Sequence, residues 1–182
     1  MPYSLFPVPC SLFPVPYLLF IFPLQTISKP YSSKGTVYLQ EASILSLGKL
    51  QSDSNYIVEG TFSIESSCYI DDTGHFNAVE FVICYNQVMV VSLAYATKKK
   101  LLLCLQEMTV EEYYKFWPSN IYITRLDSTY KSVINSKEFF CKFEVIKERK
   151  GAKLSILKTL IELSDRQGGM ASGEVDLAIK HS

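Results

Sequence analysis

Histidine is scarce in this sequence of 182 residues and neither sign of charge is in surplus, and each shortage excludes a class of function. The histidines are His75 and His181, too few for a metal site built on imidazole ligands. Lys plus Arg and Asp plus Glu both number 18, so no basic surplus is available to neutralise nucleic-acid phosphates. The same balance weakens repulsion between copies and favours self-association.

The common motifs for covalent and nucleotide chemistry are also absent. The sequence has no G-x-S-x-G, which argues against an α/β-hydrolase, and neither G-x-x-x-x-G-K-[ST] nor G-x-G-x-x-G. A pairing of His75 with a distant cysteine has no local support. We therefore expect no metal, no cofactor and no Ser-His-Asp triad.

The five cysteines are scattered along the chain and form no C-x-x-C pair. Disulfide frameworks and zinc sites usually show closer spacing. Reduced, mostly buried thiols are therefore expected, and they indicate a cytoplasmic protein.

Residues 1–28 differ in composition from the rest of the chain. SLFPVPC at 4–10 is followed directly by SLFPVPY at 11–17, and the repeated prolines exclude a continuous helix. LLFIF at 18–22 leaves a secretory signal or membrane anchor as an alternative, although no Lys or Arg precedes it and no A-x-A-like cleavage site follows. We predict that residues 1–28 are an extension outside the fold and that residues 29–182 form one domain.

The remaining pattern predicts two strands and then a long buried helix. Alternating β-branched and aromatic residues indicate strands at 36–47 and 55–64. The apolar run at 77–97 is long enough to cross a membrane, but a carboxylate and two amides inside it would be costly in lipid. A helix that protein buries on most sides fits this run better.

A short helix and four strands are expected after the long helix. Residues 109–117 predict a helix capped by Thr109 and ended by Pro118. Strand-like stretches follow at about 120–127, 138–148, 152–163 and 173–180. The order predicts an α+β domain in which an antiparallel sheet wraps a central helix.

Polar residues are concentrated where a loop runs into the long helix. Asn77 can cap the helix, and Glu80 three residues later completes a capping-box pattern. A helix start presents unpaired N–H groups and a partial positive charge, which would stabilise the oxyanion or enolate of an acyl thioester. Water or an amine could then attack without a covalent nucleophile.

Each candidate residue also has a purely structural interpretation. Asn77 and Glu80 would then only cap the helix, and His75 would be a turn residue bonded to a backbone carbonyl. Tyr69 is one of 12 tyrosines, and tyrosine more often packs than catalyses. Asn86 is harder to explain in this way, because a mid-helix amide costs roughly 1–3 kcal/mol if it is buried without a partner.

The segment CYIDDTGHFNAVEFVICYNQ at 68–87 resembles the core motif of the FcoT-like thioesterase family, hot-dog proteins that act on long-chain acyl thioesters. PYSSKG at 30–35 and GGMASGEVDLA at 168–178 resemble two further segments of that family. The likeness covers roughly residues 29–182. It implies a hot-dog fold, with the antiparallel sheet wrapped around the long helix.

The resemblance also implies which side chains act on the thioester. Two tyrosines and an amide match the family's hydrogen-bonding positions, and we expect them to be catalytic: Tyr31, Tyr69 and Asn86. Three further residues match the motif. His75 is a further catalytic candidate, and Asn77 and Glu80 are candidates for substrate binding. Members of the family lack an obvious general base or nucleophile, which agrees with the missing motifs.

Two reactions are described for the family. One is hydrolysis of fatty acyl-CoA, and the other is addition of glycine to the β-carbon of a (2E)-enoyl group on an acyl carrier protein, in isonitrile lipopeptide pathways. Both need the same oxyanion or enolate stabilisation, so the motif does not separate them. Addition would also need a base and a cation that binds the glycine carboxylate. Our hypotheses are His75 for the base and Lys34 or Arg125 for the cation. A module that binds acyl chains or carriers without turnover is the third alternative.

The resemblance implies a homo-oligomer, a dimer or a trimer of dimers, because hot-dog sites usually form between protomers, and helix geometry is consistent with this. Asn77 and Asn86 are nine positions apart. At 100° per residue this is about 900°, so the two side chains point to opposite sides of the helix. One pocket that used both would need the helix start of one chain and the helix middle of another, or a cap residue outside the helical register.

Overall fold

The computed structural model describes residues 29–47, 55–71 and 75–181. Three helices are found in these ranges: α2 (Lys29–Ser32), α3 (Ala78–Lys99) and α4 (Val110–Asn120). Six strands accompany them: β1 (Leu39–Leu47), β2 (Tyr56–Phe62), β3 (Ile121–Ser132), β4 (Phe139–Arg149), β5 (Leu154–Ser164) and β6 (Met170–Lys180). The predicted extension at residues 1–28 lies outside the described residues.

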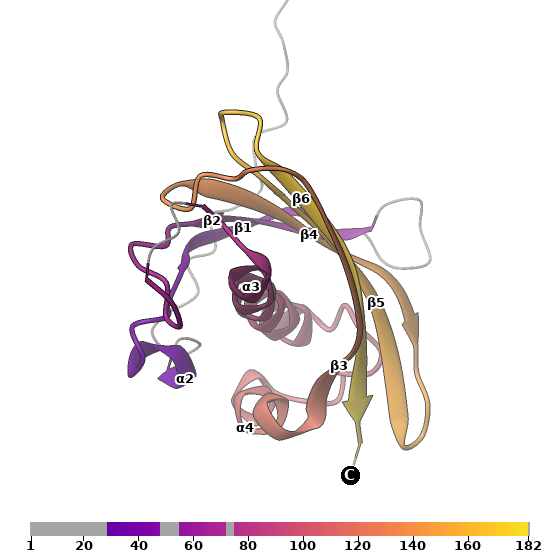
Figure 1. The fold of residues 1–182 in the computed structure, drawn as a ribbon. Helices are drawn as coiled ribbons and strands as arrows, with labels where there is room; N and C mark the ends of the chain where they lie inside the picture. Colours follow the sequence, from indigo (N-terminus) through magenta and orange to yellow (C-terminus); the bar gives the residue numbers. More distant parts are fainter. Residues whose placement is uncertain (1–28, 48–54, 72–74, 182) are drawn as a thin grey trace, which may run out of the picture.

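The six strands form one antiparallel sheet in the order β1-β2-β4-β5-β6-β3. The sheet curves around α3, while α2 and α4 lie on the open side of that helix (Figure 1). Within the described residues, β1 and β3 each pair with one neighbour only, so the sheet has two edges. The predicted α+β architecture, an antiparallel sheet wrapped around one long helix, is confirmed.

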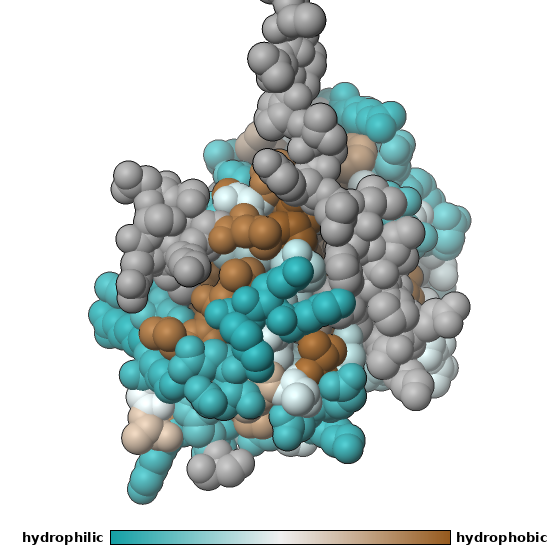
Figure 2. All heavy atoms as spheres, turned by 180° about the vertical axis from the view of Figure 1, so that it is seen from behind, coloured by the Kyte–Doolittle hydropathy of each residue, from teal (hydrophilic) through white to brown (hydrophobic). Residues whose placement is uncertain are grey.

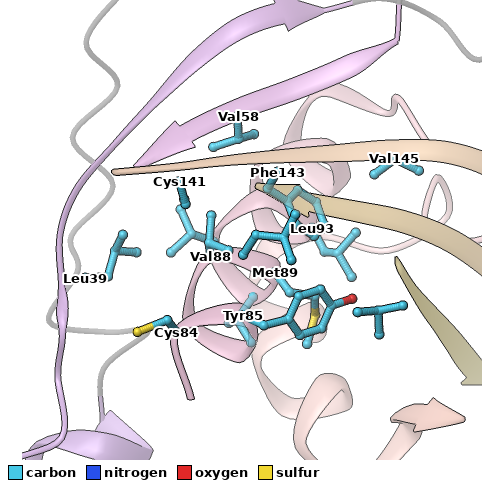
Figure 3. Packing of buried hydrophobic residues seen from close by; sticks show 14 of the residues in the cluster. Leu39, Val58, Cys84, Tyr85, Val88, Met89, Leu93, Cys141, Phe143 and Val145 are labelled. Carbon is cyan, nitrogen blue, oxygen red and sulfur yellow. The ribbon is translucent and has the colours of Figure 1, made fainter. Parts of the chain in front are cut away.

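Helix α3 forms the centre of the core. It is buried without a break from Gln87 to Thr97. Tyr85 faces the sheet, where its hydroxyl lies 2.8 Å from the Thr159 hydroxyl and its ring centroid 6.0 Å from that of Phe143 (Figure 3). By length and composition α3 could cross a membrane, but 72% of its apolar window is buried inside the protein. It is therefore a core helix, and the cytoplasmic location stays a prediction.

The structure corrects two of the predicted boundaries. Pro118 lies inside α4 and does not end it. The missing N–H falls in the last turn, where the Asn120 side chain donates to the Phe116 carbonyl at 2.9 Å and so satisfies one orphan acceptor. Strand β3 continues past residue 127 to Ser132, because its second half pairs with the first residues of β6, from Met170 onward. Such long-range pairing has no signal in a local sequence window.

The first turn of α3 lies directly on the sheet at Gly173 of β6. A Cβ atom added there would lie 2.7 Å from Cζ of Phe81 and 3.1 Å from the Asp127 carbonyl oxygen, so this close approach requires glycine. Phe76, just before the helix, packs against Phe81 and Phe139 with ring centroids 6.3 and 5.0 Å apart. These contacts fix the start of the helix relative to the sheet.

Candidate active site

The capping box predicted at the start of α3 is present. Asn77 Oδ1 accepts hydrogen bonds from the N–H groups of Val79 (3.0 Å) and Glu80 (3.3 Å), and the Asn77 N–H donates to Glu80 Oε2 at 3.1 Å. The Glu80 side chain is buried, with 3% of the residue exposed. The capping role is therefore confirmed, whereas substrate binding by Asn77 and Glu80 stays a prediction.

Capping changes the electrostatics that the sequence suggested for the helix start. The N–H groups of Val79 and Glu80 are bonded to the Asn77 side chain, and the Phe81 N–H donates to the Asn77 carbonyl at 2.9 Å. Among the described residues, no hydrogen bond is found for the Ala78 N–H. The first turn thus offers one open backbone donor together with the helix dipole, and not a set of free amides.

The loop before α3 carries two of the catalytic candidates at the protein surface. Tyr69 is 49% exposed, and it follows the exposed Cys68. His75 is exposed and lies two residues before the capping Asn77. His75 therefore lies next to the end of α3 at which Glu80 is buried, whereas Tyr69 is placed only on the loop that precedes it.

Asn86 and Tyr31 lie elsewhere in the fold. Asn86 is about two and a half turns further along α3 than Asn77 and is half-buried, and no hydrogen bond of its side chain is found within the described residues. Tyr31, on α2, is also half-buried, and burial raises the pKa of its phenol. In the part of the chain that the structure describes, no hydrogen bond or ring contact joins Tyr31, Tyr69 and Asn86. A single chain does not gather these three residues into one bonded cluster.

A glutamine that sequence analysis did not single out ties the tyrosine-bearing segment to the helix. Gln87 Oε1 accepts hydrogen bonds from the N–H groups of Tyr38 and Leu39, both at 2.9 Å, and its Nε2 donates to the Thr36 carbonyl at 2.6 Å. The Thr36 N–H and hydroxyl donate in turn to the Tyr31 carbonyl oxygen at 3.2 and 3.1 Å. Gln87 therefore holds the segment that carries Tyr31 against α3. The sequence feature that could have identified Gln87 is a polar amide within the apolar run at 77–97.

Sequence analysis also missed Tyr38, which is buried at the start of α3. Only 2% of this residue is exposed, and its hydroxyl has no hydrogen-bond partner among the described residues. Burial raises the pKa of the phenol, the Cys68 thiol and Glu80 raise it further, and the Cys68 backbone lowers it by less. Cys68 is thus close to the phenol, but the two groups do not meet hydrogen-bonding geometry. The Tyr38 phenol therefore interacts electrostatically with Cys68, on the loop that carries Tyr69, and with the buried Glu80 carboxylate.

The thiols of the core are not suited to nucleophilic attack. The four described cysteines are free, and three of them, Cys84, Cys104 and Cys141, are buried. Burial raises the pKa of each of these three thiols, so little thiolate forms at neutral pH. Among the described residues, no group of three or more His, Cys, Asp or Glu side chains is placed to hold a metal ion.

The two cations proposed for a substrate carboxylate lie on different elements. Arg125 is on the edge strand β3, where it pairs with Asp127, and both side chains are more than half exposed. Lys34 is exposed in the turn between α2 and β1. In the part of the chain described, no side-chain hydrogen bond or ion pair joins either cation to the start of α3.

Comparison with known proteins identifies the family. The family model described as the FcoT-like thioesterase domain matches residues 26–179. A (2E)-enoyl-[ACP] glycyltransferase of Mycobacterium tuberculosis is 31% identical over 159 residues, which cover 85% of this chain and 84% of that protein. One of Streptomyces coeruleorubidus is 34% identical over 122 residues, 64% of this chain and 74% of that protein. Among solved structures, a thioesterase of Haemophilus influenzae is 10% identical, with 86% of this chain and 87% of that chain covered and a TM-score of 0.48. The sheet wrapped around α3 is a hot-dog fold, and the chain belongs to the FcoT-like thioesterase family.

Proposed function

We propose that this protein acts on long-chain fatty-acyl thioesters and adds glycine to the β-carbon of a (2E)-enoyl group held by an acyl carrier protein. The relatives that it matches over most of its length support the reaction, since they are named (2E)-enoyl-[ACP] glycyltransferases. The observation in the structure that carries the proposal is the buried polar cluster at the start of α3. The open Ala78 N–H and the buried Glu80 carboxylate lie in the first turn of the helix, and the buried Tyr38 phenol is close to Glu80.

The chemistry of the addition matches what such a cluster can stabilise. Attack of the glycine nitrogen on the β-carbon breaks the carbon–carbon π bond and moves its electrons to the thioester oxygen, which becomes an enolate. The Ala78 N–H and helix dipole of one chain, with the Asn86 amide of a neighbouring chain, would lower the energy of this anion. We assign Glu80 the role of attracting the glycine ammonium group, and His75 the role of the base that removes its proton. Return of a proton to the α-carbon completes the product.

Hydrolysis of the acyl thioester is the second candidate, and the placement of the cations favours it. Glycine carries a carboxylate that needs a partner, and Arg125 is already paired on β3 while Lys34 lies in an exposed turn. Water needs no such cation. The tetrahedral oxyanion of hydrolysis would use the same donors as the enolate.

One assay separates the two reactions. The purified protein is incubated with a (2E)-enoyl acyl-carrier thioester, with and without glycine, and the products are followed by mass spectrometry beside a mixture that lacks protein. We expect a glycine-dependent gain in the mass of the carrier-bound chain. Release of free acid without glycine would select hydrolysis instead. No change in either mixture would favour a module that binds acyl chains, and would contradict an enzyme.

We further propose that the working form is a homo-oligomer, a dimer or a trimer of dimers. The edge strand β3 lacks a second neighbour in the described chain and exposes Tyr122 and Tyr130, 45% and 41% respectively. Figure 2 shows apolar side chains gathered beside hydrophilic ones on the back face of the molecule. Light scattering during size-exclusion chromatography should give a mass of two chains or a larger multiple. A fully active monomer would contradict this proposal.

A further inference from the structure

Two buried hydroxyls near the start of α3 stand out because they have no hydrogen-bond partner within the described residues: Tyr38 Oη and Ser67 Oγ. Burying a hydroxyl without a partner destabilises a protein, so such groups are uncommon and need a reason. The three most buried tyrosines are all satisfied: Tyr56 by the Ser92 carbonyl at 2.8 Å, Tyr85 by Thr159 at 2.8 Å and Tyr113 by the Val90 carbonyl at 3.2 Å. Tyr38 is therefore an exception in a core that otherwise pairs its phenols.

The backbone of Tyr38 is held on both sides, which fixes the point from which the buried phenol projects. Its N–H donates to Gln87 Oε1 at 2.9 Å, and its carbonyl oxygen accepts from the Ser63 N–H at 3.0 Å. With 2% of the residue exposed, the hydroxyl is a preorganised donor without an acceptor. Ser67 directly precedes Cys68, which lies beside the phenol, so both unpaired hydroxyls belong to one region.

The surroundings of the phenol restrict the kind of oxygen that it can receive. Burial, the Cys68 thiol and Glu80 raise the pKa of Tyr38 and outweigh the lowering by the Cys68 backbone, so the phenol stays protonated and acts as a donor. A ligand that arrives with a full negative charge at this point would be repelled by the Glu80 carboxylate. The carbonyl oxygen of a thioester is neutral when it binds and gains charge only as the reaction proceeds. A fixed donor therefore contributes most in the transition state, where catalysis needs it.

We infer that Tyr38 is a catalytic residue whose hydroxyl donates a hydrogen bond to the carbonyl oxygen of the bound acyl thioester, with Ser67 as a second donor in the same subsite. This inference rests on the proposed function, because it needs an acyl thioester at the start of α3. It holds equally for glycine addition and for hydrolysis, since both place negative charge on that oxygen.

The test compares Tyr38→Phe with Tyr85→Phe, two substitutions that each remove one buried hydroxyl. We expect Tyr38→Phe to lower kcat/KM about 10–100-fold, as for a hydrogen bond to a charged oxygen, and to leave the melting temperature unchanged or raised. Tyr85→Phe breaks the bond to Thr159 and should lower the melting temperature while kcat/KM stays near the wild-type value. Ser67→Ala should show the Tyr38 pattern with a smaller loss. Wild-type kcat/KM in Tyr38→Phe, or a fall in its melting temperature like that of Tyr85→Phe, would overturn the inference.

A binding measurement separates this inference from the proposed function. If the wild type turns over no acyl thioester, the proposed function fails, and affinity for a saturated acyl-carrier thioester becomes the readout. Wild type should then bind this probe several-fold more tightly than Tyr38→Phe. Equal affinities, or no binding by either protein, would overturn the inference itself.

Discussion

Asn86→Ala should reduce acyl-thioester turnover by about 100–1,000-fold, the usual loss when one donor to a developing oxyanion is removed. The Asn86 side chain is half-buried in the middle of an apolar helix, and no hydrogen bond is found for it within the described residues. An amide that stabilises nothing in the folded chain is best explained by a partner that arrives with the substrate. Because no bond of the native state is lost, the melting temperature should change little. Steady-state kinetics and thermal unfolding of the same preparation measure both quantities.

Asn120→Ala is the matched control for this substitution. Asn120 is also half-buried and ends a helix, but its side chain donates to the Phe116 carbonyl at 2.9 Å. This control should keep wild-type turnover and lose a little stability. Wild-type turnover in Asn86→Ala would show that its amide is outside the site. A large drop in melting temperature that Asn86→Leu does not recover would show that the amide is structural, whereas recovery by Asn86→Leu would assign the drop to lost side-chain volume.

Gln87→Met should lower the free energy of unfolding by about 2–6 kcal/mol, because two buried N–H groups lose their acceptor at roughly 1–3 kcal/mol each. Those groups belong to Tyr38 and Leu39, which are 2% and 3% exposed, and the Thr36 carbonyl loses its donor as well. Methionine has nearly the volume and shape of glutamine, so the effect reports the hydrogen bonds and not a cavity. Domains of ordinary stability have about 5–15 kcal/mol, and this loss is a large share of that.

Urea denaturation followed by circular dichroism measures the change. Gln167→Met, at an exposed residue in the β5–β6 turn, is the matched control and should shift the free energy of unfolding by less than about 0.5 kcal/mol. A Gln87→Met protein as stable as this control would mean that water or another group replaces the lost amide. The adjacent pair thus gives opposite expectations, with loss of turnover at Asn86 and loss of stability at Gln87.

Features of the fold that depend on local signals were predictable from sequence. The helix at 77–97 and its capping box at Asn77 follow from residues within one turn of each other, and the structure places α3 at Ala78–Lys99. Thr109 likewise caps α4 with Glu112, as its pattern indicates. The alternating burial of β4 and β5 agrees with their alternating sequence.

The parts that sequence analysis missed depend on partners far apart in the chain. Gln87 bonds to residues 48 to 51 positions away, so no local window reveals that it anchors β1. The extension of β3 to Ser132 is set by pairing with β6, which follows it by about 40 residues. Tyr38 resembles any other aromatic residue at the start of a strand, and its unpaired hydroxyl becomes visible only once Cys68 and Glu80 are folded around it.

The capping box of α3 also bears on how such a scaffold diversifies. Because Asn77 already satisfies most amides of the first turn, further hydrogen-bond donors at this end of the helix have to come from side chains on separate segments, such as the unpaired hydroxyls of Tyr38 and Ser67. Each of these can be exchanged by a single codon change without unwinding the helix. A lineage built on this plan can therefore retune hydrogen bonding at this end of the helix by substitutions at a few positions, while the folded framework persists.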